Sequence, residues 1–263
     1  NTHVTLSGES SVTYFIGGSK ANNADNTNLT TGDVTAVISG GTVTGSAMSW
    51  GNKDKISVVG GSYVKSTGAG GGTPALTTAE TGKISLSISG GTFTGAVFGG
   101  RAADNYGETQ ASDSAKPDLF IKTGVSSLLI EGGTFDSSDF GVFGGSAALG
   151  KQSSTESSGS SVTIDAKNDV DITGRVVGGD LLGFGGKDND ATSSTINGST
   201  SVSITGSKKI ETSESVIGGS LLNLKLDGES SSSSITRTSS VFVDAENATL
   251  GDEVIGGSYV RQR

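Results

Sequence analysis

The chain has 263 residues with 43 glycines and no cysteine, and only 32% of it is hydrophobic and 5% aromatic. So few large apolar side chains argue against a doubly wound enzyme or a helix bundle, and the lack of cysteine excludes disulfides and thiol chemistry. A net charge of −9 opposes binding to nucleic acid or to an anionic membrane surface, and no apolar run is long enough for a membrane-spanning helix.

One short motif recurs seven times along the chain: two large apolar residues, a glycine pair, and then usually serine. Its first glycines are 43, 39, 45, 34, 40 and 38 residues apart, so the chain is built from repeats of about 40 residues. The copies are Phe15–Ser19, Val58–Ser62, Val97–Arg101, Val142–Ser146, Val176–Asp180, Val216–Ser220 and Val254–Ser258.

A strand with one buried face precedes most copies, because apolar and polar residues alternate there. Ile84, Leu86 and Ile88 alternate with serines, and three repeats continue into a second glycine pair followed by threonine. These pairs begin Gly40–Val43, Gly90–Phe93 and Gly132–Phe135. Each repeat is therefore predicted to run strand, tight corner, short strand, second corner and third short strand.

Polar segments rich in serine, threonine, asparagine and aspartate separate these predicted strands. We expect them to be flexible surface loops, because they have little apolar surface to bury. They are residues 20–33, 65–83, 102–118, 151–160, 187–200 and 229–240.

The repeat predicts an all-β fold, a right-handed parallel β-helix of about seven coils forming a single domain over residues 1–263. One repeat cannot bury its apolar side chains alone, whereas stacked coils share a narrow core with glycine, serine and threonine ladders at the corners. The alternative is a seven-bladed β-propeller, whose repeats have a similar length. A single tryptophan, Trp50, and four tyrosines are few for the bulky packing between propeller blades.

The stretch Ile84–Gly100, ISLSISGGTFTGAVFGG, resembles one coil of the β-helical passenger domains of Gram-negative autotransporter adhesins. The resemblance extends over the whole chain as a style of repeat, with serine, threonine and glycine abundant and cysteine absent. It implies a secreted virulence-related adhesin displayed on the bacterial outer-membrane surface. Because residue 1 is asparagine and no leader follows it, we expect a fragment of a longer surface protein.

Two aspartates are the strongest candidates for catalysis, because β-helical enzymes that act on polysaccharides use paired carboxylates. Asp169 and Asp171 flank Val170 and are predicted to point to one face about 6–7 Å apart, with Arg175 close behind. The alternative is a solvated outer face opposite buried Val170 and Ile172, and no aromatic residue lies nearby in sequence to stack on a sugar.

Metal sites have little support in the sequence. His3 is the only histidine and is expected to be exposed to solvent. Without a second histidine or any cysteine, a structural zinc site is excluded. Asp188 and Asp190 follow a glycine-rich stretch that faintly resembles calcium-binding RTX repeats, but the pattern occurs once. We therefore assign no catalytic, cofactor-binding or metal-binding residue, and expect no cofactor.

The sequence thus favours a non-enzymatic adhesin or interaction module that displays polar loops to a host surface protein or glycan. The motif copies reach from residue 15 to residue 260 without an evident cap, so we also expect continuation in a longer protein or self-association. The alternatives are a polysaccharide-active enzyme and a structural spacer.

Overall fold

The computed structural model describes residues 1–22, 28–47, 55–66, 77–105, 119–150, 153–183, 191–224 and 230–262. These residues form strands and turns, and the model contains no helix among them. Among the same residues, accordingly, no helix is long and apolar enough to cross a membrane. The chain is therefore all-β over the described ranges, as predicted.

The strands belong to three sheets, which we name A, B and C. Sheet A contains β1 (Thr2–Leu6), β5 (Asn28–Thr31), β6 (Val34–Ile38), β11 (Thr77–Thr81), β12 (Ile84–Ile88), β16 (Leu119–Ile130), β19 (Ser153–Ala166), β22 (Ala191–Ile196), β23 (Thr200–Gly206), β27 (Ser230–Ile235) and β28 (Ser239–Ala245). Sheet B contains β2 (Ser11–Val12), β3 (Phe15–Ile16), β7 (Thr42–Val43), β8 (Ser46–Ala47), β9 (Lys55–Val59), β13 (Thr92–Thr94), β14 (Ala96–Phe98), β17 (Gly133–Phe143), β20 (Val170–Val177), β24 (Ile210–Thr212), β25 (Val216–Ile217), β29 (Ala248–Thr249) and β30 (Val254–Ile255). Sheet C contains β4 (Lys20–Asn22), β10 (Tyr63–Ser66), β15 (Ala102–Asn105), β18 (Ala147–Gly150), β21 (Leu181–Gly183), β26 (Leu221–Leu224) and β31 (Tyr259–Gln262).

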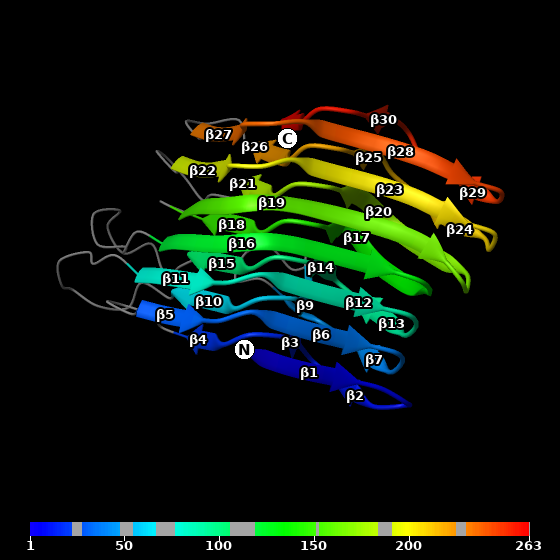
Figure 1. Cartoon of the computed structure of the whole chain (residues 1–263), viewed down its shortest axis with the longest axis horizontal. Helices are drawn as coiled ribbons and strands as arrows, with labels where there is room; N and C mark the ends of the chain where they lie inside the picture. The colour runs from blue at the N-terminus through cyan, green and yellow to red at the C-terminus, as the bar shows by residue number, and fades with distance from the viewer. Residues whose placement is uncertain are drawn as a thin grey trace.

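Strands of successive repeats pair in parallel and in register, so that equivalent residues stack in columns. Leu86 of β12, for example, lies between Ala36 of β6 and Leu128 of β16. Figure 1 shows the repeats piled from the blue N-terminal end to the red C-terminal end, and sheet C receives one strand from each of the seven repeats. Among the described strands, only β8 and β9 pair antiparallel. This arrangement is consistent with a parallel β-helix or solenoid, and not with propeller blades, whose strands pair within one repeat.

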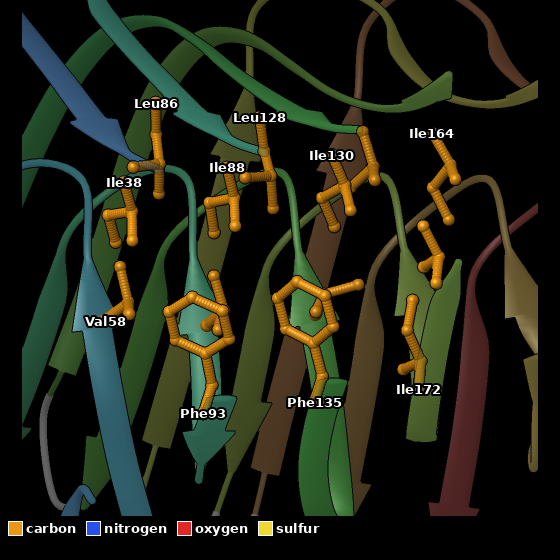
Figure 2. Close-up of a cluster of buried hydrophobic side chains, with 14 of the residues drawn as sticks. Ile38, Val58, Leu86, Ile88, Phe93, Leu128, Ile130, Phe135, Ile164 and Ile172 are labelled. Carbon is orange, nitrogen blue, oxygen red and sulfur yellow. The ribbon is translucent and has the colours of Figure 1, made fainter. Parts of the chain in front are cut away.

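The apolar core lies between the sheets and consists of three clusters. The largest joins sheets A and B, and Figure 2 shows isoleucines of sheet A, such as Ile88 and Ile130, facing Phe93, Phe135 and Ile172 of sheet B. Because equivalent residues stack, the rings of Phe93 and Phe135 lie 4.8 Å apart and nearly parallel. A second cluster joins sheets B and C, and a third joins sheets C and A.

The two consecutive apolar residues of the motif are buried on opposite faces of sheet B. Val97 belongs to the cluster shared with sheet A, whereas Phe98 belongs to the cluster shared with sheet C. Val176 and Val177 divide in the same way. A strand buried on both faces has no polar alternation, which explains why the motif reads apolar–apolar while the strands of sheet A alternate.

The diglycine corners between sheets B and C are formed where neighbouring repeats come too close for any side chain. The N–H of Gly178 donates to Ile217 O at 2.8 Å, and that of Gly179 to Gly219 O at 2.8 Å. A Cβ on Gly178 would lie 2.6 Å from the backbone oxygen of Gly218. Glycine is required here by close approach of two backbones.

The other glycine pairs, at the corner between sheets A and B, are needed for a different reason. The second glycine of each pair has a positive φ: +93° at Gly41, +116° at Gly91 and +125° at Gly133. Residues with a Cβ rarely adopt this conformation.

The prediction of flexible loops in the polar segments is wrong where the structure describes them. Parts of these segments form β4, β5, β11, β22, β27 and the first half of β19. Their inward-facing side chains are small hydroxyls, such as the buried Thr155, Ser157 and Ser194. Hydrogen bonding between repeats makes these strands, although they bury little apolar surface.

We predict that Gly178→Ala lowers the free energy of unfolding by about 1–3 kcal/mol, because the new Cβ would press on the backbone of the next repeat. Gly256→Ala is the matched control, since Gly256 occupies the same motif position but a Cβ there would meet no atom within 4 Å. Urea denaturation of both variants measures the difference. Equal loss in the two variants would contradict the importance of close approach.

Candidate functional site

The aspartates proposed for catalysis lie on the solvated outer face of sheet B. Asp169 is in the turn before β20 rather than on the strand, and Asp171 is on β20; both are exposed. Val170 and Ile172, which alternate with them, are buried in the core between sheets A and B. The two carboxylates thus lie on a solvated outer face opposite buried Val170 and Ile172, which was the alternative to a catalytic pair.

Cations and acids of the next repeat surround this pair. The backbone N–H of Lys209 donates to Asp169 Oδ1 at 3.3 Å, and Asp171 is paired in register with Glu211. The Lys209 ammonium lies 2.8 Å from Glu211 Oε1, and this hydrogen bond, followed by the nearby carboxylates, raises the pKa of Lys209. The acids form part of an exposed charge network between neighbouring strands.

Arg175 does not join the pair. Its side chain is almost fully buried in the second half of β20 and forms an ion pair with Glu214 of the next repeat.

His3 is exposed on β1, as expected, with Nε2 3.5 Å from Thr5 Oγ1. Asp188 and Asp190 lie outside the described residues, as does Trp50. The described residues bring together no group of three or more histidine, cysteine, aspartate or glutamate side chains that could hold a metal ion.

The outer face of sheet A carries an uncharged strip that the sequence analysis did not single out. It consists of two columns of outward-facing residues in register, one per repeat. The first column is His3, Thr35, Ser85, Ser127, Ser161, Ser201 and Ser240, and the second is Thr5, Val37, Ser87, Leu129, Thr163, Ser203 and Phe242. We call these residues the hydroxyl strip; apart from the histidine, none of its side chains can carry a charge.

Charged residues border the hydroxyl strip on both sides. Asp33 and Lys83 lie along one margin, and Glu131 and Asp165 lie along the other. Neighbouring strands are about 4.8 Å apart and alternate residues of one strand about 6.7 Å apart, so the strip is a regular grid about 30 Å long. The repeat motif was visible in sequence, but the strip becomes apparent only when residues about 40 positions apart are aligned by strand register.

A second ordered array follows each diglycine corner between sheets B and C, and it is buried from the second repeat to the sixth. In five of the six steps between repeats, a side-chain oxygen at this position accepts a hydrogen bond from the backbone N–H of the equivalent residue one repeat earlier: Ser19 N–H donates to Ser62 Oγ at 3.1 Å, and Ser220 N–H to Ser258 Oγ at 3.0 Å. The step to Arg101 is missing, because arginine has no side-chain oxygen. We call this array the corner ladder. It consists of Ser19, Ser62, Arg101, Ser146, Asp180, Ser220 and Ser258, and it confirms the predicted serine stacking at the corners.

Asp180 is the acidic member of the corner ladder, and it is completely buried. Its Oδ1 accepts from Ser146 N–H at 2.7 Å, and its Oδ2 accepts from Thr155 at 2.8 Å and Ser194 at 2.6 Å. Burial raises the pKa of Asp180, and these hydrogen bonds oppose the rise. The carboxylate is fully engaged by the protein, so its role is structural.

The chain matches no protein-family model, no curated protein and no solved structure. The corner ladder is buried from Ser62 to Ser220, whereas the side chains of the hydroxyl strip are exposed or half-buried on the outer face of sheet A. The strip is the candidate functional site.

We predict that Asp180→Asn reduces the loss of stability with increasing pH. In the native state Asp180 keeps its proton to a higher pH than in the unfolded chain, where aspartate titrates near 3.9. The contribution of Asp180 to the free energy of unfolding is therefore fully present at low pH, and it is lost as the pH rises from about 4 through the raised pKa. Urea denaturation at pH 4, 6 and 8 measures this, and parallel pH profiles for the parent protein and Asp180→Asn would contradict it.

Proposed function

We propose that this protein is a non-enzymatic adhesin or interaction module, in which a right-handed parallel β-helix presents the hydroxyl strip to a host surface protein or glycan. The observation that carries the proposal is the strip itself. In a chain of net charge −9, thirteen of its fourteen positions cannot ionise, and the fourteenth is His3.

The chemistry of the strip suits a neutral, hydrogen-bonding partner. Each serine or threonine hydroxyl can donate and accept, so it can match a sugar hydroxyl or a peptide group without desolvating a charge. Leu129 and Val37 add small apolar contacts within the grid. A single neutral hydrogen bond contributes only about 0.5–1.5 kcal/mol, so affinity would arise from many repeated contacts along the strip.

The bacterial cell-surface location is proposed on the resemblance of Ile84–Gly100 to a coil of an autotransporter passenger domain. A parallel stack of repeats without cysteine suits such a location, because its stability does not depend on the redox environment. The strands are held by backbone hydrogen bonds between repeats throughout the described chain. A rod of this kind would hold the strip in one fixed orientation.

We predict that Ser127→Glu combined with Ser161→Glu reduces binding at least tenfold, because two carboxylates at the centre of the strip would have to be desolvated on contact. The measurement uses fluorescently labelled protein on an array of neutral and acidic glycans, and on cultured epithelial cells. Failure of the folded parent protein to bind any glycan or cell in these assays would refute the proposal.

The matched control is Thr92→Glu combined with Thr134→Glu. These threonines are exposed and, like Ser127 and Ser161, face each other on neighbouring strands, but they lie on sheet B. The control adds the same charge and should leave binding unchanged. Equal loss in both double variants would show that net charge, and not the strip, governs binding.

Self-association is a second proposed interaction, carried by the last repeat. Val243 stacks on Ile204 in a column of otherwise buried residues but is 42% exposed, and Val254 is 54% exposed in the column of buried Val216. We predict concentration-dependent oligomers by light scattering, and their loss in Val243→Glu, because a charge there opposes burial. A strictly monomeric species at millimolar concentration would contradict this.

A further inference from the structure

Arg101 is the one basic member of the corner ladder, and it is buried inside the protein. It follows the diglycine between β14 and β15, where five of the other repeats have serine and one has aspartate. Its exposed fraction is 0%, and it is among the largest fully buried side chains. The diglycine of the preceding repeat makes room for it, since a Cβ on Gly61 would lie 2.7 Å from Arg101 Cγ.

The protein satisfies only part of this guanidinium. Nη1 donates to Lys122 O at 3.1 Å, whereas Nε and Nη2 make no hydrogen bond with any described residue. Thr123 follows Lys122 on β16 and is paired in register with Thr81 on β11. The hydroxyls of both threonines are buried and also make no hydrogen bond. Each of these groups can donate, so what they lack in common is an acceptor.

Among the described residues, the one charge that acts on Arg101 is the exposed carboxylate of Glu80. Burial lowers the pKa of Arg101 to about 9, which leaves it a cation at neutral pH, and the Coulomb field of Glu80 partly opposes that lowering. Asp180 is the buried acid of the corner ladder, but it lies two repeats further on and is already bonded to Ser146, Thr155 and Ser194. A buried cation that is only partly compensated, by a carboxylate exposed to solvent, is destabilising.

We propose that Arg101, Thr81 and Thr123 form an internal binding site for a small monovalent inorganic anion of the halide class. An anion accepts from several donors at once and neutralises the guanidinium, whereas a water molecule does only the first. A halide also needs no donor of its own, which suits a site made of N–H and O–H groups. The site stabilises the contact between the third and fourth repeats, and it is independent of the function proposed for the hydroxyl strip.

The test compares the thermal stability of the full chain in sodium chloride, sodium bromide and sodium gluconate at matched ionic strength. A ligand that binds only the native state raises Tm with its concentration. We expect Tm to be about 2–4 °C higher in 200 mM chloride or bromide than in gluconate, and this difference to disappear in Arg101→Met. Asp180→Asn, changed in the same ladder outside the proposed site, should keep the halide response.

Two further measurements decide the outcome if Arg101→Met does not fold. Thr123→Val has nearly the parent shape but lacks one donor, so it should need a higher bromide concentration for half of the Tm rise. Anomalous diffraction from crystals grown in bromide should place a peak beside Arg101 Nε and Nη2. Equal Tm in halide and gluconate for the parent protein, or bromide-soaked density without that peak, would overturn the proposal.

Discussion

The structure depends on the contact between the backbones of successive diglycine corners. At Gly60, Gly99, Gly144, Gly178 and Gly218 a Cβ would lie within 2.7 Å of a carbonyl oxygen of the next repeat, so no side chain can be accommodated. The same glycines donate their N–H groups to that repeat. Sheets B and C meet at these corners, and the closeness of the backbones there brings every strand into register with its neighbours.

Register, once set at the corners, accounts for both the core and the surface. It stacks Phe93 on Phe135 and Phe98 on Phe143, with ring centroids 4.8 and 5.0 Å apart. It also aligns outward hydroxyls from seven repeats into one strip, and inward ones into the corner ladder. A narrow core of this kind is stable with only 32% hydrophobic residues because each apolar side chain is covered by its equivalents in the repeats on either side.

The parts of this fold that could be predicted from the sequence are those with a local signal. The diglycine motif and the alternation of Ile84, Leu86 and Ile88 identified the repeats and the strands of sheets A and B. The first half of β19 could not be recognised in this way, because its buried positions are held by Ser153, Thr155 and Ser157, whose hydrophobicity is that of a loop. Its strand character comes from pairing with β16 and β22, more than 30 residues away.

The candidate site was less predictable for the same reason. The acidic pair Asp169 and Asp171 could be seen within three residues, yet the structure places it on a solvated face. The hydroxyl strip is formed by residues about 40 positions apart, and single serines give no signal among so many. Arg101 and Asp180 were visible as departures from serine in the motif, but only the geometry shows that both are buried.

The corner ladder has a direction. In five of its six steps a backbone N–H of one repeat donates to a side-chain oxygen of the following repeat, as from Ser19 to Ser62, Arg101 to Ser146 and Asp180 to Ser220. Along the stack, the N–H groups therefore all point toward the following repeat and the side-chain oxygens toward the preceding one. A contact that continued this ladder between molecules would be head-to-tail, and head-to-tail contacts that do not close into a ring generate open filaments rather than symmetric dimers.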